Sequence, residues 1–513
     1  MFFAILKVGP AKTSAWAVVL LAAALLLMTA AWRGAEYDEG YTLFLTAGTA
    51  RPAWPATPFT AAEALKTLSG ASTAGRIAAD LRATDVHPPL YFWAVAVWRD
   101  IAGTSLFAIR GFSVACSLGA LLLVAAIARR AAIPPVAAML LTLGCYGFCY
   151  SGIIARGFAL AQFFSLAGVL FLLVADRRAN RWVALLAGFS LGAASFSNYL
   201  ASFVAAAGLL WFGGRRRHTP GVWLPAVLGF SAFMPADLWF FLAQHASRAD
   251  QFPPFTLLAS LGRLGHYAAG SIMGGLPLYA GALFGPATLV AVAAALSVLL
   301  VSLTGLIVWY WRKIAKPGPR ALLGLCALAP PVGLLALGAV FNTTPIELRY
   351  LAFATPFIGF LLAGLAAALP ARAGVFLLCV LLPLQALAIA GLMTRPETMQ
   401  PQAAAAHEAA SLMGASGISF VPRGNDGVGV VGAFLLESPP GQRVQVVPPD
   451  ATAAALRAWA RPFPRVAMVL LALDADSRAA VETMRTALAE DPCWRATGSG
   501  FNLRGYERVC PGE

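Results

Sequence analysis

Charged residues are scarce in this chain of 513 residues. Asp, Glu, Lys and Arg together make up 12% of it, whereas soluble domains carry roughly 25%. Hydrophobic residues make up 59%, and the mean hydropathy is +0.74. So little charge excludes an ordinary soluble protein and predicts a polytopic α-helical membrane protein.

Apolar stretches of about 18 residues or more, each long enough to cross a hydrocarbon core, recur along the chain. We expect about eleven membrane spans, and we expect the shorter apolar segment 88–101 to lie in the interface. The spans are predicted at residues 13–32, 105–128, 132–150, 154–175, 182–198, 200–214, 221–243, 280–311, 321–341, 350–369 and 372–393. The first should be an uncleaved helix and not a signal peptide, because its apolar run is long and many spans follow it.

Basic residues outnumber acidic ones, 37 to 23, and they gather in alternate loops. The positive-inside rule assigns these loops to the cytoplasm, so the N-terminus is expected inside and the segment after about residue 394 outside. The loops contain Lys7 and Lys12; Arg129 and Arg130; Arg177, Arg178 and Arg181; Arg215, Arg216 and Arg217; and Arg312, Lys313, Lys316 and Arg320. Because the arginines are divided among short loops, nucleic acid is not expected as a partner. The alanine- and glycine-rich composition favours a GC-rich bacterial genome, hence the bacterial inner membrane with a periplasmic C-terminal domain.

Cysteine is also sparse, with seven residues. Five lie within predicted spans and are expected to be small packing residues. Cys493 and Cys510 instead flank a short polar segment in the part of the chain expected outside, where disulfides are stable. We predict a bond between them.

From about residue 395 the composition changes, and residues 395–513 alternate between strand and helix patterns. Strands are expected at 418–421, 443–447 and 466–473, helices at 429–437, 451–460 and 477–490, and a hairpin at 494–509. This alternation predicts a small α/β domain. Residues 427–432 read G-x-G-x-x-G, but no acidic residue clearly ends the next strand, so a tight turn is preferred to a dinucleotide site.

Two acid-rich strings lie in the first outer loop, residues 33–104. Residues 36–41 read EYDEGY and contain Asp38 and Glu39, and residues 85–90 read DVHPPL and contain Asp85 and His87. Each string alone has a simple explanation, as helix N-terminal acids or as a helix cap. Acidic residues at the mouth of a transmembrane helix are costly to hold there, however, and two such strings in one loop predict a functional site.

Basic and aromatic side chains are expected near the same membrane face. Arg156 is predicted to begin the fourth span, Arg349 and Tyr350 the tenth, and His266 lies in the outer loop 244–279. Any one arginine can simply extend to the interface. Together they would form a positive patch at the height of a lipid phosphate, and guanidinium groups suit phosphate recognition.

These strings together resemble one known group of membrane enzymes. The matching features are Asp38 with Glu39; residues 85–91; residues 103–105 followed by Arg110; Tyr150 and Ser151 with Arg156; and Arg349 and Tyr350 with residues 354–356. The chain resembles a GT-C glycosyltransferase of the family 39 type, which includes the protein O-mannosyltransferases and the aminoarabinose transferases of lipid A. The resemblance covers about residues 15–395 and assigns residues 1–394 to a catalytic transmembrane domain.

The resemblance implies an inverting glycosyltransferase that takes a sugar from a polyprenyl phosphate on the outer face of the membrane. By that resemblance Asp38 is the general base and Glu39 orients it. Asp85 and His87 line the cleft, and Arg349 or Arg156 holds the donor phosphate. The aminoarabinose transferases carry Lys where this chain has His87, so neither known acceptor class carries over. The acceptor is a lipid, a glycan or a protein.

Several alternatives stay open at this point. Asp38, Glu39, Asp85, His87 and His266 are also the residue types that bind a divalent metal, although their spacing is not diagnostic. A transporter or lipid flippase would use ionisable residues too, but these usually show internal repeats, and none is evident here. An oligosaccharide ligase or polymerase would use a pyrophosphate-linked donor.

Overall fold

The computed structural model describes residues 12–244, 252–274, 286–394, 401–424, 427–500 and 502–510. The chain divides into two compact units. We call the first the helical unit; it comprises Met1–Trp32, Leu81–Ala94 and Arg110–Thr394. We call the second the sheet unit; it comprises Arg33–Asp80, Val95–Ile109 and Arg395–Glu513.

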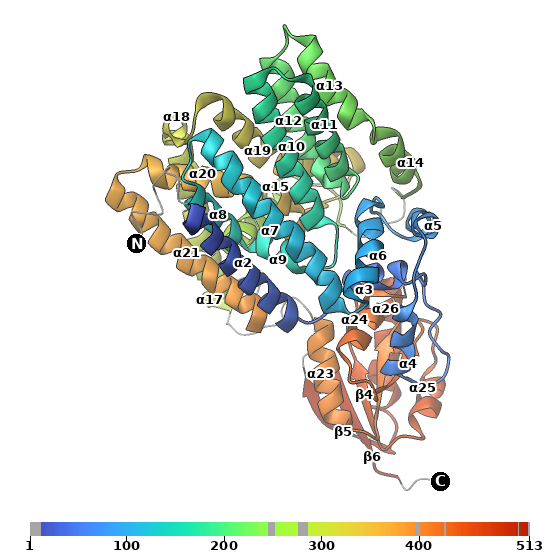
Figure 1. Ribbon diagram of the computed structural model, residues 1–513. Helices are drawn as coiled ribbons and strands as arrows, with labels where there is room; N and C mark the ends of the chain where they lie inside the picture. The colour runs from blue at the N-terminus through green and yellow to red at the C-terminus, as the bar shows by residue number, and fades with distance from the viewer. Residues whose placement is uncertain are drawn as a thin grey trace. The chain divides into compact units, whose positions relative to one another are not determined.

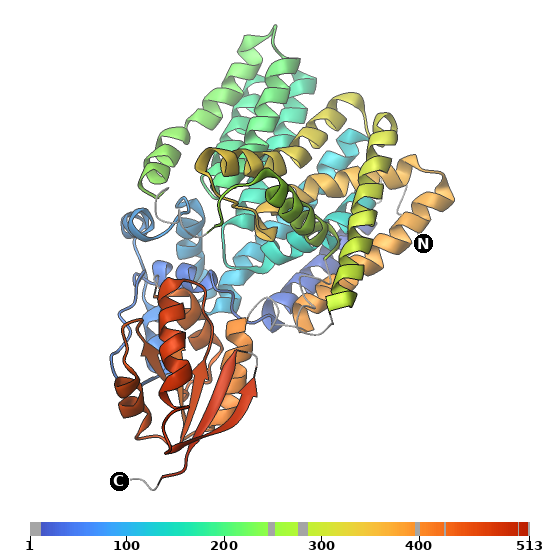
Figure 2. The same ribbon diagram turned by 180° about the vertical axis from the view of Figure 1, so that it is seen from behind.

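The described part of the helical unit is built from α-helices and two short 3-10 helices (Figure 1). Figure 2 shows it from behind, where α15 and α17 lie in front. In chain order the elements are α2 (Lys12–Trp32), α7 (Leu106–Ala131), α8 (Pro135–Gly144), α9 (Tyr146–Ile153), α10 (Phe158–Arg178), α11 (Arg181–Ser195), η2 (Tyr199–Ala201), α12 (Ser202–Arg215), α13 (Pro220–Ser231), α14 (Met234–Gln244), α15 (Leu257–Met273), α17 (Pro286–Trp309), α18 (Trp311–Ile314), α19 (Pro317–Phe341), η4 (Leu348–Phe353), α20 (Thr355–Ala368) and α21 (Ala371–Thr394). The helices approach closely through small residues: a side chain at Gly188 of α11 would meet the Ala226 carbonyl of α13.

A multi-pass membrane protein is confirmed, but the number of spans is not. Among the described residues, seven helices are long and apolar enough to cross a membrane, or eight if α8 and α9 form one bent span. Three segments predicted as spans fold as the shorter helices α11, α12 and α20, of 15, 14 and 14 residues. Part of the predicted span 280–311 lies outside the described residues. The count of about eleven stays a prediction.

The predicted continuous span 132–150 is broken. Helices α8 and α9 meet at an angle of 70° at Cys145, whose backbone is not helical. Gln385 of α21 packs at this point, because a side chain on Gly144 would occupy the place of its amide oxygen. The Gln385 amide donates a hydrogen bond to the carbonyl of Ile272 at 3.0 Å. Irregular backbone is tolerated at membrane depth where protein surrounds it, which is the situation here.

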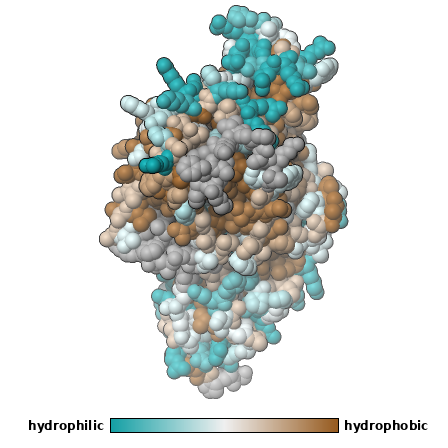
Figure 3. Space-filling view, turned by 60° about the vertical axis from the view of Figure 1, so that its left-hand side comes forward, coloured by the Kyte–Doolittle hydropathy of each residue, from teal (hydrophilic) through white to brown (hydrophobic). Residues whose placement is uncertain are grey.

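The basic loops converge on one end of the helical unit. Asp176, near the end of α10, pairs with Arg215 and Arg216 at the end of α12. The backbone N–H of Lys316 donates to the Ala131 carbonyl at 3.1 Å, which joins the loops after α7 and before α19. A broad hydrophobic area covers the helices, with hydrophilic side chains gathered at one end of the unit (Figure 3). This is the arrangement that the positive-inside pattern predicts.

The sheet unit contains a six-stranded mixed sheet in the order β1-β3-β2-β4-β6-β5. The strands β3, β2 and β4 are parallel, and β1, β6 and β5 pair antiparallel at the two sides. The strands are β1 (Phe59–Thr60), β2 (Ile418–Pro422), β3 (Arg443–Val447), β4 (Arg465–Val469), β5 (Trp494–Gly500) and β6 (Leu503–Arg508). The helices are α3 (Glu39–Thr46), α4 (Ala61–Leu65), η1 (Lys66–Ser69), α23 (Pro401–Met413), α24 (Gly429–Glu437), α25 (Ala453–Ala460) and α26 (Ala475–Ala487). The boundary between the two units falls within α5 (Ala74–Thr84), α6 (Leu90–Ala102) and α7, so each of these helices belongs partly to both.

Helices cover both faces of the sheet. Val421 and Val469 face a core shared with α4, α23 and α24, whereas Phe420 and Met468 face a core shared with α25 and α26. Strands buried on both sides read as continuous apolar runs, which is why they were recognisable in the sequence. The predicted small α/β domain is therefore confirmed. Strand β1, contributed by the first loop, was not predicted.

The predicted hairpin is present as β5 and β6. These strands pair antiparallel with a bulge between Ala496 and Gly498. A disulfide joins Cys493 to Cys510, with the two Cα atoms 4.9 Å apart. It closes the two ends of the hairpin over a separation of 17 residues.

Candidate functional site

Asp85, His87 and Arg156 form one buried cluster in the helical unit. The Asp85 and Arg156 side chains are each 1% exposed, and an Asp85 oxygen lies 3.5 Å from the nearest guanidinium nitrogen of Arg156. The His87 side chain is 15% exposed. A carboxylate, an imidazole and a guanidinium, predicted from separate parts of the sequence, are thus brought together.

One imidazole nitrogen lies between the two charged groups. Nδ1 of His87 is 2.8 Å from Oδ1 of Asp85 and 2.9 Å from Nη2 of Arg156. With its proton on Nδ1, the neutral ring donates to Asp85; with its proton on Nε2, Nδ1 can accept from Arg156. The position of one proton therefore decides which neighbour the ring binds.

Arg156 lies in a non-helical turn and not at the start of a span. The Arg156 N–H donates to the Ile154 carbonyl at 2.8 Å, and α10 begins only at Phe158. Ser113 of α7 holds the same carbonyl at 2.7 Å. Gly157 allows this turn to approach α11, because a Cβ there would lie 2.4 Å from the Ser197 carbonyl. Since Arg156 is 1% exposed, the interpretation that it extends to the membrane interface is wrong.

The loop that carries Asp85 and His87 is clamped by α14. The Gln244 amide, at the end of α14, donates to the carbonyls of Leu81 and His87 at 3.0 and 3.1 Å. The Tyr199 hydroxyl donates to the Gln244 oxygen at 2.9 Å and so fixes the orientation of the amide. Burial, followed by the negative charges of Asp237 and Asp85, raises the pKa of Tyr199, which keeps this hydroxyl protonated as a donor.

Neither Tyr199 nor Gln244 was singled out from the sequence. Gln244 is 157 positions from His87, and no spacing rule links the two. The one available signal was a buried amide at the end of an apolar helix, where it must find partners. The interpretation of Asp85 as a helix cap is wrong. Helix α6 begins at Leu90, and the Asp85 carboxylate accepts from the Val86 N–H instead.

Arg349 and Tyr350 lie on the 3-10 helix η4. Arg349 pairs with Glu347 at 2.7 Å, and its side chain is 19% exposed. Helix η4 packs against α9, α10 and α15. The Gln162 amide of α10 donates to the Ala352 carbonyl at 2.8 Å, so η4 is fixed to the helix that follows the Arg156 turn. Arg349 therefore lies on a segment that is hydrogen-bonded to α10, the helix that follows Arg156. The start of a membrane span was predicted here, but the segment is a 3-10 helix.

His266 lies on α15, which packs on η4. Its ring contacts Tyr267 edge to face at a centroid distance of 5.4 Å. The neighbouring Arg263 donates to the Ile346 carbonyl at 2.7 Å, just before η4. Burial, followed by the positive charge of Arg263, lowers the pKa of His266 below its usual value. This shift favours the neutral form of the imidazole.

Asp38 and Glu39 belong to the sheet unit, where they start helix α3. Asp38 occupies the N-cap position and is 5% exposed, and Glu39 is the first helical residue and is fully buried. The Glu39 carboxylate accepts the Glu36 N–H at 2.8 Å, and Glu36 pairs with Arg33 at 2.6 Å. Both acids thus lie at the N-terminus of a helix, as the simpler interpretation predicts. The Glu39 carboxylate also stabilises the turn that contains Asp38.

Metal ligands do not cluster among the described residues: no three His, Cys, Asp or Glu side chains there are grouped closely enough to hold an ion. The cluster in the helical unit contains one carboxylate and one imidazole, and its third member is a cation. A guanidinium in that position disfavours a divalent ion beside it.

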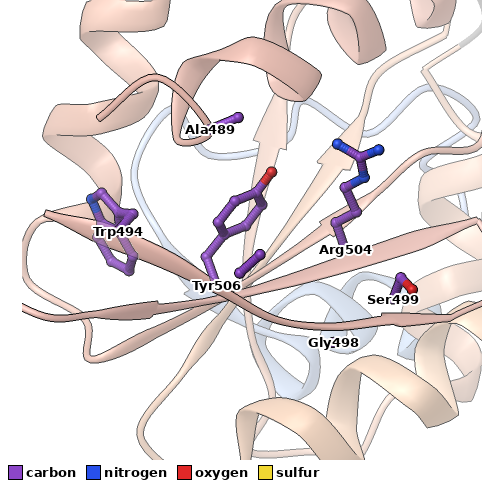
Figure 4. Close-up of a pocket in the computed structure, with 7 residues that line it drawn as sticks. Ala489, Trp494, Gly498, Ser499, Arg504 and Tyr506 are labelled. Carbon is purple, nitrogen blue, oxygen red and sulfur yellow. The ribbon is translucent and has the colours of Figure 1, made fainter. Parts of the chain in front are cut away.

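A cavity of about 410 Å³ lies in the sheet unit over β5 and β6. Figure 4 shows Tyr506 and Arg504 extending toward the side of Ala489, with Trp494 and Ser499 at opposite ends. Trp494 and Tyr506 are 9% and 3% exposed and belong to the core beneath the sheet. None of the residues predicted to carry chemistry lines this cavity.

Part of the chain that carries this cluster is similar in sequence to a known family. Residues 86–239 match the family model of the dolichyl-phosphate-mannose-protein mannosyltransferases. This range includes His87 and Arg156 and begins one residue after Asp85. No curated protein matches the chain in sequence.

Three solved structures are similar over most of the chain. ArnT from Cupriavidus metallidurans, bound to undecaprenyl phosphate, has a TM-score of 0.50 and 12% identity, over 97% of this chain and 98% of ArnT. The arabinofuranosyltransferase AftD from Mycobacteria has a TM-score of 0.46 and 14% identity, over 99% of this chain and 41% of AftD. The Archaeoglobus fulgidus oligosaccharyltransferase has a TM-score of 0.44 and 12% identity, over 96% of this chain and 73% of that enzyme.

The likeness to ArnT concerns the fold. The chain is a multi-pass membrane protein with the GT-C fold of membrane glycosyltransferases. The match to the mannosyltransferase model covers residues 86–239, which is less than a third of the chain, and agrees with the resemblance seen in the sequence. The fold class predicted from the sequence is confirmed.

The buried cluster makes a prediction about stability. Replacing Arg156 by Ala leaves the Asp85 carboxylate buried without its cation, and breaking a buried ion pair in this way costs about 3–5 kcal/mol. We expect Arg156→Ala to lower the thermal unfolding temperature in detergent substantially. Arg178→Ala, at an exposed position, is the matched control and should change the stability by less than about 0.5 kcal/mol. Equal unfolding temperatures for the two variants would contradict the ion pair.

Proposed function

We propose that this protein is an inverting glycosyltransferase that moves a hexose or pentose from a polyprenyl-phosphate donor to an acceptor hydroxyl on the outer face of the membrane. The buried cluster of Asp85, His87 and Arg156 carries the proposal. It lies at the edge of the matched mannosyltransferase region, before α10, while the basic loop with Arg177, Arg178 and Arg181 lies at the other end of α10. A helix of 21 residues spans about 30 Å, so the cluster and this basic loop are expected at opposite membrane faces.

The reaction requires one base and one stabilised leaving group. The acceptor oxygen attacks the anomeric carbon from the face opposite the phosphate and forms the new glycosidic bond. The bond from that carbon to the phosphate oxygen breaks, and the polyprenyl phosphate leaves with an additional negative charge. The acceptor proton passes to a carboxylate. The protein must therefore supply a carboxylate base for the proton and fixed cations for the phosphate.

Asp38 is the proposed base, and Glu39 is the residue that orients it. The observed contacts support this division. The Glu39 carboxylate accepts the Glu36 N–H and is thereby part of the turn itself. A group bound to its own backbone serves geometry better than proton transfer. Asp38, at the N-cap position next to it, is the carboxylate that this turn presents.

Between the two arginines, Arg349 is the better candidate for the donor phosphate. Both arginines pair with a carboxylate, but the Arg349 side chain is 19% exposed, whereas that of Arg156 is 1% exposed. Arg156 is then the residue that fixes the Asp85–His87 loop, through its contacts with both side chains. Tyr350 stacks beneath Arg349, with the guanidinium carbon 5.4 Å from the ring centroid, and His266 adds a neutral imidazole beside the same segment.

The proposed setting is the bacterial inner membrane, with the donor and acceptor on the periplasmic side. The N-terminus lies in the cytoplasm and the segment after about residue 394 in the periplasm. The convergence of the basic loops at one end of the helical unit supports this orientation. The Cys493–Cys510 disulfide also suits an oxidising compartment.

The orientation predicts the behaviour of reporter fusions. Alkaline phosphatase, which is active only in the periplasm, should be active when fused after residue 400. The same reporter fused after Arg217, within a basic loop, should be inactive. The measurement is phosphatase activity in intact cells, normalised to the amount of fusion protein. The reverse pattern would overturn the topology.

Glycosyl transfer itself is tested by supplying donors of one chemical class. The purified protein in detergent is given polyprenyl-phosphate mannose, glucose or arabinose, together with lipids and proteins extracted from a bacterial envelope. Release of polyprenyl phosphate reports transfer whichever acceptor is used. We expect release that depends on the acceptor extract for at least one donor. No release from the whole panel would count against the proposal.

The role of Asp38 predicts a chemical defect. Asp38→Asn keeps the shape of the side chain but cannot take the acceptor proton, so transfer should fall by about 10²–10⁴-fold. Glu39→Gln should lose less, because an amide oxygen can still accept the Glu36 N–H. The control is binding of undecaprenyl phosphate, which both variants should retain. Transfer by Asp38→Asn at a near-normal rate would rule out Asp38 as the base.

The role of Arg349 predicts a binding defect. Arg349→Ala should weaken the binding of undecaprenyl phosphate by roughly 10- to 100-fold, the usual value of hydrogen bonds to a charged group. The matched control is Arg372→Ala, an exposed arginine at the start of α21. Binding is measured with the purified proteins in detergent. Equal affinities for the two variants would exclude Arg349 as the phosphate ligand.

A further inference from the structure

The G-x-G-x-x-G string at residues 427–432 has a place in the fold that a tight turn alone does not explain. Gly427 makes the turn, with a φ of +67° that favours glycine. The other two glycines lie on α24, three residues apart and so on one face of that helix. This face is turned toward α3, the helix that starts at the acidic turn (Figure 1).

Both glycines lie close to the segment at residues 37–44, and at Gly429 any other residue would block the contact. A Cβ on Gly432 would lie 3.9 Å from the Cα of Gly40, so the two helix backbones are nearly in contact. A Cβ on Gly429 would lie 2.0 Å from the ring of Tyr37, a separation that atoms cannot adopt. The Tyr37 ring therefore rests directly on the backbone of α24. Tyr37 is the residue immediately before Asp38.

The same turn is held by hydrogen bonds from the C-terminal part of the chain. The Ala35 N–H donates to the Glu437 carboxylate at the end of α24. The Trp54 indole donates to the Gly427 carbonyl. Glu437 is itself fixed by His407 of α23 at 3.2 Å. The residues on either side of Asp38 are thus seated on α24 from its first turn to its last.

We propose that α24 of the C-terminal domain positions Asp38, with Gly429 and Glu437 as positioning residues that act through the turn at residues 35–39. This inference rests on the proposed function, since it assumes that Asp38 is the base. It assigns the C-terminal domain a part in the reaction. The glycine string serves close helix packing in place of a phosphate.

A methyl group at position 429 tests the proposal. Gly429→Ala forces the Tyr37 ring to move by more than 1 Å and carries the neighbouring Asp38 with it. A misplacement of about 1 Å can cost 10²-fold in rate. We expect kcat for polyprenyl-phosphate sugar, with the donor of highest turnover, to fall by about that factor. The KM for the donor should stay unchanged, because Gly429 does not act on the donor.

A control variant and a rescue variant test whether the added methyl group acts through Tyr37. Gly441→Ala adds the same methyl group where no atom lies within 4 Å, so its kcat should match that of the unaltered protein. Adding Tyr37→Ala to Gly429→Ala removes the ring that the new methyl group meets and should restore part of the lost kcat. A purely structural fault would instead be made worse by the loss of the half-buried ring.

A double-mutant cycle with Asp38→Asn separates positioning from folding. If Gly429 acts through Asp38, then Gly429→Ala should cause no further loss in the Asp38→Asn protein. An equal fold-loss in both backgrounds would overturn the proposal. So would a kcat for Gly429→Ala equal to that of Gly441→Ala while Asp38→Asn is inactive. A fully active Asp38→Asn protein would instead overturn the proposed function, which keeps the two failures distinct.

A second variant covers the case in which Gly429→Ala does not fold. Glu437→Ala removes the acceptor of the Ala35 N–H without adding any atom. We expect a smaller fall in kcat, about 10-fold, with an unchanged KM for the donor and again no further loss in the Asp38→Asn background. An unchanged kcat for this variant would overturn the proposal in the same way.

Discussion

The Asp85 carboxylate is almost completely buried, and the residues around it must compensate for its lost contact with water. A buried carboxylate must have a cation and hydrogen-bond donors, or it is strongly destabilising. Arg156 supplies the cation from a non-helical turn just before α10. Gly157, the next residue, lets this turn lie against the Ser197 carbonyl. The amide of Gln244 then fixes the loop from the other side.

The shared nitrogen of His87 gives the cluster a second property. A ring that can bind either a carboxylate or a guanidinium through one atom has two tautomeric arrangements of similar geometry. A charged group that approaches the ring will favour one of them, because the two tautomers orient the dipole of the ring differently.

The sequence was sufficient for features that depend on local pattern. Strands buried on both faces, such as β2 and β4, and the hairpin closed by Cys493 and Cys510 could be recognised from composition and spacing. Asp85 and His87 could be recognised because acids are costly beside a membrane. Three features could not be predicted: the break between α8 and α9, the pairing of β1, and the clamp by Tyr199 and Gln244. Each depends on a partner far away in the chain, and nothing in the local residues specifies that partner.

The pairing of the first loop with the C-terminal segment has a consequence for biosynthesis. Ala35 and Glu437 are 402 positions apart, so the acidic turn leaves the ribosome long before the helix that seats it. At typical synthesis rates the delay is on the order of 20 to 80 s. During that time the helical unit can insert and pack, while strand β1 and the turn at residues 35–39 have nothing to pair with. Assembly of the acidic turn therefore waits for α24, and a chain that stalls before α24 is made lacks the helix on which this turn packs.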